Sequence, residues 1–136
     1  MTRILIAGVP KAGKTTLADQ LLATWPHGWA GEPPVSIRHT DDLITQLDWS
    51  AVSHLVASEW MQEQVPWIIE GVAVPRALRK WLLAHPGEKP AELVYWSATS
   101  KVPLTKGQAT MAKGCIKVWN EVREELVLRG VEVRHF

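Results

Sequence analysis

Short apolar runs alternate with amphipathic stretches along the chain, and this alternation is the main signal of its fold. Continuous apolar runs of about four to eight residues are typical of parallel strands that are covered on both faces. Five such runs predict strands, at residues 3–9, 35–39, 67–72, 92–98 and 131–136. Apolar residues at helical spacing predict the intervening helices, at residues 14–25, 40–47, 50–64, 75–84 and 110–128. The pattern predicts an α/β fold in which a five-stranded parallel sheet lies between two layers of helices.

The segments between these elements are polar or rich in Gly and Pro. Pro26–Pro34 is dense in both residue types and predicts a surface loop. Residues 99–108 form a polar connection that carries Lys101 and Lys106. Repeats and low-complexity segments are absent from the sequence, so we expect one domain over residues 1–136.

The composition is that of an ordinary globular domain and excludes several function classes. The chain has 136 residues, 46% hydrophobic and 21% charged, with a net charge of +1, so the total charge indicates no general affinity for polyanions. The single Cys115 excludes an intramolecular disulfide framework and a cysteine-based zinc site. No apolar run approaches the roughly 20 residues that span a bilayer. The first apolar run ends at a glycine motif, which is typical of a buried strand rather than a signal peptide. We therefore expect a cytoplasmic protein with no membrane partner.

Tryptophan is unusually frequent, with eight residues against one Phe and one Tyr. Trp buries a large area in cores and in the walls of substrate pockets. It also stacks on nucleic-acid bases. Both interpretations stay open at this point.

The strongest chemical signal directly follows the first strand. The pattern G-x-x-x-x-G-K-[ST] is matched in full by Gly8, Val9, Pro10, Lys11, Ala12, Gly13, Lys14 and Thr15, with Thr16 continuing the segment. The glycines allow a tight turn whose N–H groups surround a phosphate at the N-terminus of the next helix. We expect Lys14 to reach the β- and γ-phosphates and the Thr15 hydroxyl to bind Mg²⁺. The motif predicts that the chain binds ATP and Mg²⁺ through these residues.

Carboxylates follow the second strand and end the third. Asp41 and Asp42 come directly after the second strand, beside the expected phosphate loop. A carboxylate there could accept the proton of an acceptor hydroxyl, and we assign this role to Asp41, with Asp42 as a helix cap or partner. Glu70 ends the third strand, where it could hold a magnesium-bound water or the acceptor, or form a salt bridge only. Lys14, Asp41 and Glu70 are the predicted catalytic residues.

These carboxylates also help to choose among the classes of protein that use such a phosphate loop. A motor ATPase or a GTPase would be expected to place an Asp, not a Glu, at a strand end as a magnesium ligand. The chain also has no N-K-x-D stretch for guanine recognition. The pattern therefore favours a small kinase.

With these motifs the whole chain resembles the P-loop kinase superfamily, in its adenylate-kinase-like and polynucleotide-kinase-like group. The resemblance implies a mobile lid between the fourth strand and the last helix, here about residues 99–113, that closes over ATP and supplies positive charge. Monophosphate kinases use arginines for this work, but this chain has none between Lys80 and Val122. The candidates are Lys101, Lys106 and Lys113, which supply a point charge without a bidentate fork.

Two arginines and two further resemblances bear on the identity of the acceptor. Arg76 and Arg79 follow the third strand at i, i+3 spacing and could clamp an acceptor phosphate. The stretches "TDDLI" and "PRALRKW" are similar to phage polynucleotide kinase, although the arginine that follows the Asp pair in that family is missing here. The stretches "EGVAVPRAL" and "LTKGQATMAKGCIKVW" resemble small phage kinases that phosphorylate 5-hydroxymethyluracil in DNA. That likeness would place the protein in the cytoplasm of an infected host.

Three hypotheses therefore remain. The first is an ATP·Mg²⁺-dependent kinase that acts on a hydroxymethylated base in DNA, with Trp49, Trp60 and Trp67 available to grip an everted base. The second is a kinase of a free nucleotide, nucleoside or small metabolite. The third is an ATPase module that transfers no phosphate to an acceptor.

Overall fold

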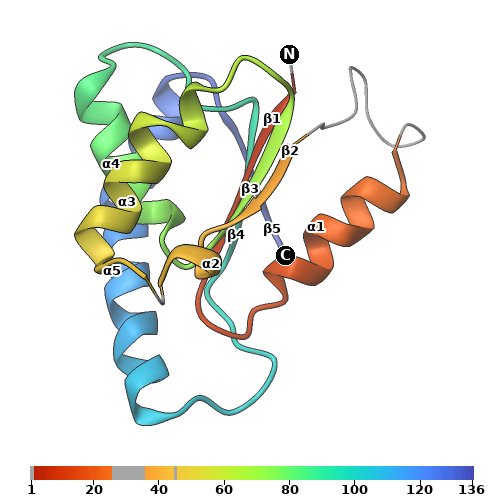
Figure 1. Ribbon diagram of the computed structural model, residues 1–136, viewed down its shortest axis with the longest axis vertical. Coiled ribbons are helices and arrows are strands. Elements are labelled where there is room, and N and C mark those ends of the chain that lie inside the picture. Colours follow the sequence, from red (N-terminus) through yellow and green to blue (C-terminus); the bar gives the residue numbers. More distant parts are fainter. Residues whose placement is uncertain (1, 26–35, 45) are drawn as a thin grey trace.

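The sheet has five strands, all parallel, as the apolar runs predict. The computed structural model describes residues 2–25, 36–44 and 46–136. The strands are β1 (Arg3–Gly8), β2 (Ser36–His39), β3 (Trp67–Gly71), β4 (Leu93–Ser97) and β5 (Glu132–His135). Their spatial order is β2-β3-β1-β4-β5, with β1 in the centre (Figure 1). The central strands carry the most apolar sequences because both of their faces are covered.

Apart from the second helix, which ends at Ile44 and not at Leu47, the helices occupy the predicted intervals with two differences. They are α1 (Lys14–Ala23), α2 (Asp41–Ile44), α3 (Trp49–Ser58), the 3₁₀ turn η1 (Trp60–Gln62), α4 (Val74–Ala84) and α5 (Lys106–Leu128). The predicted helix at 50–64 is in fact α3 followed by η1, with a break at Glu59. The predicted loop Pro26–Pro34 lies outside the described residues.

The second difference is the start of α5, which begins at Lys106 and not at Thr110. Thr105 is its N-cap, and the Thr105 Oγ1 accepts from the Gln108 N–H at 3.2 Å while the Gln108 Oε1 accepts from the Thr105 N–H at 3.0 Å. This reciprocal capping box satisfies two donors that the first turn would otherwise leave free. The predicted lid at 99–113 therefore consists of a short connection followed by the first two turns of α5.

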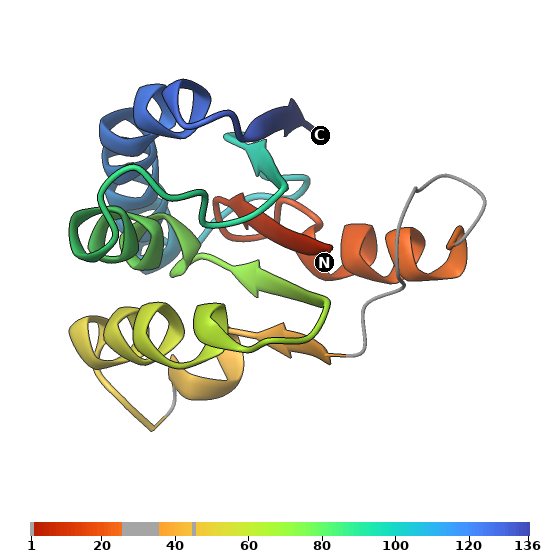
Figure 2. The same ribbon diagram turned by 90° about the horizontal axis from the view of Figure 1, so that it is seen from above.

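Helices cover both faces of the sheet (Figure 2). Helix α1 packs on one face, where Ala18 and Leu21 meet Ile4 and Ile6 of β1. Helices α3, α4 and α5 cover the other face, where the alternate β1 residues Leu5 and Ala7 point into a larger core. The three-layer arrangement agrees with the predicted fold class. In such an arrangement, binding residues lie at the carboxyl ends of the strands, because the helices cover only the faces of the sheet.

Most of the described tryptophans belong to the core. Trp60 is 8% exposed and Trp67 is fully buried, so neither is available to grip an everted base. Trp96 and Trp119 stack at 4.7 Å between ring centroids and join β4 to α5. Trp49 is half-buried, and its ring is covered by the guanidinium of Arg76 at 5.3 Å. The base-gripping role predicted for Trp60 and Trp67 is therefore wrong, because the hydrophobic gain of burying these rings places them under α3 and α4.

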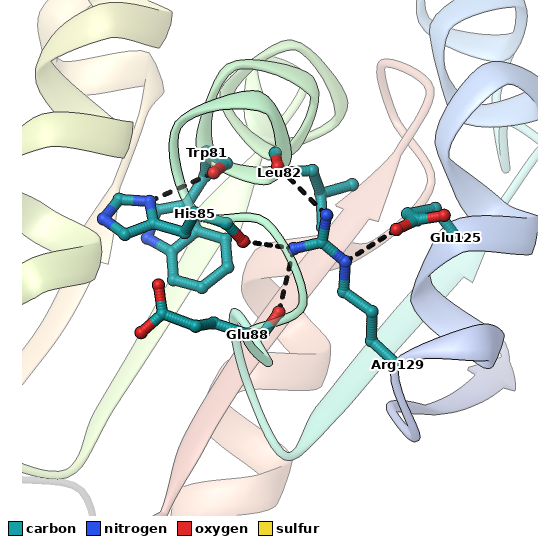
Figure 3. Close-up of polar contacts among 6 residues, drawn as sticks. All are labelled: Trp81, Leu82, His85, Glu88, Glu125 and Arg129. Carbon is teal, nitrogen blue, oxygen red and sulfur yellow. Dashed lines mark hydrogen bonds and ion pairs between the residues drawn. The ribbon is translucent and has the colours of Figure 1, made fainter.

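A single arginine ties the end of α4 to the end of α5 (Figure 3). The Arg129 guanidinium donates to the backbone carbonyls of Leu82 at 3.0 Å, His85 at 2.6 Å and Glu88 at 2.9 Å. Its Nε donates to Glu125 Oε1 at 2.8 Å. The Leu82 carbonyl lies in the last turn of α4, and those of His85 and Glu88 follow the helix. The arginine supplies donors that the helix does not, and the His85 carbonyl also accepts from the Glu88 N–H at 3.3 Å.

None of the helices in the described ranges is long and apolar enough to cross a membrane.

Candidate active site

The candidate site lies where the central parallel strands end. In the sheet register, Gly8 of β1 is opposite Ser97 of β4, and His39 of β2 is opposite Glu70 of β3. Parallel strands bring their carboxyl ends to one edge. The segment after each strand therefore reaches the same small region.

The segment from Gly8 to Thr16 forms a tight turn that leads into α1. Lys11 has φ 62° and Gly13 has φ 93°, both in the left-handed region. Gly13 is the residue before the helix, and no side chain caps the first turn of α1. The turn is closed by the Ala12 N–H, which donates to the Val9 carbonyl at 3.3 Å. The free N–H groups at the start of α1 are the kind that bind phosphate oxygens.

Lys14 is buried inside this turn. Lys14 is only 7% exposed, and its Nζ donates to the Val9 carbonyl at 2.7 Å. Burial lowers the pKa of Lys14 below its ordinary value, while the negative charges of Glu70 and Asp41 act in the opposite direction. The predicted catalytic lysine thus lies within electrostatic reach of both predicted catalytic carboxylates.

Glu70 is 2% exposed and accepts two hydrogen bonds on one oxygen. The His39 Nδ1 donates to Glu70 Oε1 at 2.6 Å, and the Thr15 Oγ1 donates to the same oxygen at 3.3 Å. A hydroxyl and a carboxylate are the oxygen ligands that Mg²⁺ prefers, directly or through water. The two residues predicted separately for magnesium thus meet, and they fit such an ion.

A cavity of about 320 Å³ opens between the turn after β1, which is the predicted phosphate loop, and the helices on the other side. Pro10, Lys11 and Lys14 line its phosphate-loop side. Its other walls are formed by Asp41, Ile44, Val72, Gln108 and Met111. Asp41 lines the cavity and Asp42 does not, which distinguishes the two members of the pair.

Thr40, which precedes α2, is buried, and its Oγ1 has no hydrogen-bond partner among the described residues. It therefore does not cap this helix through its side chain.

The connection between β4 and α5 is attached to the phosphate loop. The Lys101 N–H donates to the Lys11 carbonyl at 2.8 Å, and the Ser100 Oγ donates to the Pro10 carbonyl at 2.8 Å. The Lys101 ammonium lies so close that a Cβ on Gly13 would be 2.8 Å from its Nζ. Of the three lysines named as lid candidates, Lys101 therefore contacts the loop. Lys106 and Lys113 are exposed on α5 and do not line the cavity.

Arg76 and Arg79 have different surroundings, although both lie on α4. Arg79 forms an exposed ion pair with Glu121 of α5 at 2.9 Å. Arg76 stacks on Trp49, and its Nη1 is buried without a hydrogen-bond partner in the described part of the chain. Its Nη2 lies 2.9 Å from the position that a Cβ on Gly114 would take. The Arg76 charge is therefore not paired with a carboxylate of the described residues, whereas the Arg79 charge is paired with Glu121.

Cys115 contacts the backbone next to the candidate site. Its thiol is fully buried and donates to the carbonyls of Gly8 at 3.5 Å and Val72 at 3.7 Å. Burial raises the pKa of Cys115 to about 11, so the thiol stays neutral and serves as a small packing residue with a weak donor. It joins α5 to the ends of β1 and β3.

Sequence reasoning missed several residues that shape the cavity. Ile44, Gln108 and Met111 come from α2 and α5 and carry no motif of their own. For Gln108 a signal was present, because Thr105 and Gln108 have the T-x-x-Q spacing of a capping box. The contact of His39 with Glu70 follows from strand order, which apolar runs do not reveal.

No protein-family model matches this chain, and no curated protein shows significant similarity to it. The fold places the chain in the α/β class with an all-parallel sheet. The resemblance to P-loop kinases stays a prediction from the sequence.

Proposed function

We propose that the chain is an ATP- and Mg²⁺-dependent kinase that transfers the γ-phosphate to a hydroxyl group, and that its acceptor is the hydroxymethyl group of 5-hydroxymethyluracil in DNA. The observation that carries the proposal is that Lys14 and Asp41 line one cavity between the phosphate loop and α2. A buried cation for the phosphates and a carboxylate for the acceptor are the two groups that phosphoryl transfer needs most.

In the proposed step the acceptor oxygen attacks the γ-phosphorus. The bond from that phosphorus to the bridging oxygen breaks, ADP leaves, and the hydroxyl proton passes to the Asp41 carboxylate. Lys14 stabilises the charge on the phosphate oxygens, assisted by the Lys101 ammonium above Gly13. Mg²⁺ would neutralise charge on the nucleotide phosphates, with Thr15 and Glu70 as the residues to hold it.

One observation favours an acceptor in DNA, and a second is compatible with it. Arg76 makes no hydrogen bond or ion pair with a described residue, so its positive charge would attract a backbone phosphate, towards which the buried Nη1 would have to turn. The cavity of about 320 Å³ is at the small end of ligand sites, which suits a single everted base better than a long ligand.

A free nucleoside is the second candidate acceptor. The same volume that suits an everted base also suits a nucleoside, and the net charge of +1 provides little long-range attraction for DNA.

The test is transfer of label from γ-labelled ATP to DNA that contains 5-hydroxymethyluracil, with free nucleosides as parallel acceptors. Label on DNA supports the full proposal, and label on nucleosides alone supports the second candidate. ATP hydrolysis that no acceptor stimulates would mean an ATPase without an acceptor.

Variants separate the donor half of the site from the acceptor half. Asp41→Asn should reduce transfer by at least about 100-fold while ATP binding is retained. Asp42→Asn is the matched control, because Asp42 lies outside the cavity and should keep most of the activity. Lys14→Ala should slow transfer to every acceptor. Full activity of Asp41→Asn would contradict the assignment of the base.

A further inference from the structure

Gln108 combines a structural hydrogen bond with a free donor at the cavity. It is the third residue of α5, and its Oε1 accepts from the Thr105 N–H at 3.0 Å. It also lines the cavity together with Asp41 and Met111. The same side chain therefore caps the helix and faces the proposed acceptor.

The capping box fixes the orientation of the Gln108 amide. A backbone N–H can only donate, so the amide oxygen must be the atom that faces Thr105. The opposite orientation would place the amide NH₂ against another N–H donor. The Nε2 group remains, and it makes no hydrogen bond with any residue in the described ranges. The Gln108 oxygen is thus already engaged by the Thr105 N–H, and a molecule in the cavity would meet chiefly the unused NH₂ donors.

The neighbouring walls are suited to a flat ring. Ile44, Val72 and Met111 supply apolar surface around the cavity, and Ile44 and Met111 also pack against the core under α3 and α4. Apolar walls with a few fixed polar groups are the usual composition of a small-molecule site, in which the polar groups provide specificity. Asp41 and Gln108 are the polar side chains that line this cavity outside the phosphate loop.

We propose that Gln108 is a specificity-determining residue that selects an acceptor ring with a carbonyl oxygen beside the reacting hydroxymethyl group, and rejects one with an amino group there. This inference rests on the proposed kinase function. Uracil carries an oxygen at C4, next to the C5 substituent, whereas cytosine carries an NH₂ donor at the same place. The amide NH₂ pairs with the oxygen, but opposite an amino group it leaves donors unpaired in a partly closed site.

The experiment compares kcat/KM for two DNA oligonucleotides of the same sequence, one with 5-hydroxymethyluracil and one with 5-hydroxymethylcytosine. Both carry the same primary hydroxyl. We expect the wild-type chain to prefer the uracil form by at least about 10-fold, as expected for one neutral hydrogen bond gained against one donor left unpaired. The corresponding free nucleosides are run in parallel, so that the preference is measured for either acceptor class.

Gln108→Glu sharpens the test because Glu is a standard residue at this place in a capping box. The variant keeps an oxygen for the Thr105 N–H, but it presents an acceptor where the wild-type chain presents a donor. The preference for uracil should fall by at least about 10-fold and move toward cytosine. Its melting temperature should stay near that of the wild-type chain, which separates the effect from a loss of fold.

Thr105→Ala is the matched control. It removes the Thr105 hydroxyl from the capping box but keeps the backbone N–H that orients Gln108. This variant should lose stability without a change in base preference. Equal kcat/KM for the two bases, or an unchanged preference in Gln108→Glu, would overturn the inference and leave the kinase proposal intact. Absence of transfer to any acceptor would overturn both.

Discussion

Arg129 and Arg76 both lie at the junction of α4 and α5, but their guanidinium groups differ completely in hydrogen bonding. Arg129 donates to three carbonyls and to Glu125 (Figure 3). Arg76 has a buried Nη1 without a partner and is held by the ring of Trp49. A buried donor without a partner costs about 1–3 kcal/mol, so the fold retains Arg76 at a cost that it avoids for Arg129. The difference indicates that Arg129 serves the fold, whereas the proposed function gives Arg76 a role in binding the acceptor.

The largest effect is expected from Arg129→Ala. The change leaves the carbonyls of Leu82 and Glu88 without their donor and that of His85 with the Glu88 N–H alone. We expect a loss of about 3 kcal/mol in the free energy of unfolding. Urea denaturation measures it. Acceptor KM at a temperature where the variant is folded should be unchanged. A large rise in KM would show that Arg129 does more than hold the fold.

Arg76→Met should have the opposite effects, with little change in the free energy of unfolding and a clear rise in the acceptor KM. Methionine keeps apolar contact with Trp49, so the free energy of unfolding should change by less than about 1 kcal/mol. The KM for the DNA acceptor should rise about 10-fold, because one charge-assisted hydrogen bond to the acceptor is lost. Steady-state kinetics with saturating ATP provide the measurement. An unchanged KM together with a clear loss of stability would reverse the comparison.

Gly114→Ala tests the position of the Arg76 guanidinium without removing it. The new Cβ would lie 2.9 Å from the Arg76 Nη2, so the end of this flexible side chain must shift. Alanine favours a helix interior by about 0.5–1 kcal/mol over glycine, which should hold or raise stability. We expect a KM for the DNA acceptor a few-fold above that of the wild-type chain. Gly107→Ala is the control, since nothing lies within 4 Å of its Cβ position and KM should not move.

Arg79→Met should have the smallest effect of the series. It is the same change as at Arg76, three residues further along α4, but the ion pair that it breaks with Glu121 is exposed on both sides. Such pairs contribute about 0–1 kcal/mol. Stability and acceptor KM should both stay close to the wild-type values. An effect of Arg79→Met equal to that of Arg76→Met would mean that the two arginines are not distinguished by their surroundings.

The phosphate site could be proposed from the sequence alone because its pattern is local, and its binding of phosphate stays a prediction. Nine consecutive residues, Gly8 to Thr16, carry the glycine positions and the lysine within one strand-turn-helix unit. The parallel sheet could be predicted for a similar reason, since continuous apolar runs indicate strands buried on both faces. The meeting of Thr15 and Glu70 follows once both lie at the same sheet edge.

The acceptor side could not be predicted in the same way because it is assembled from segments that are far apart. Arg76 and Arg79 are equivalent in an i, i+3 pattern, and only the course of α5 brings Glu121 to one and Gly114 to the other. The placement of Trp60 and Trp67 depends on which face of the sheet each meets. These are properties of helix packing, to which single-sequence patterns are insensitive.

The connection from Ser97 to Thr105 has a consequence for how the site tolerates change. At one end it is hydrogen-bonded to the phosphate loop through Ser100 and Lys101, and at the other it begins the helix that carries Gln108. Its residue count therefore sets the spacing between the turn at Pro10 and Lys11 and the side chain of Gln108. In the proposed reaction this would be the spacing between the transferred phosphate and the acceptor ring. One inserted residue can lengthen an extended chain by about 3.5 Å, more than the length of a hydrogen bond. Among relatives of this chain, the residues of the connection should vary while its length stays constant.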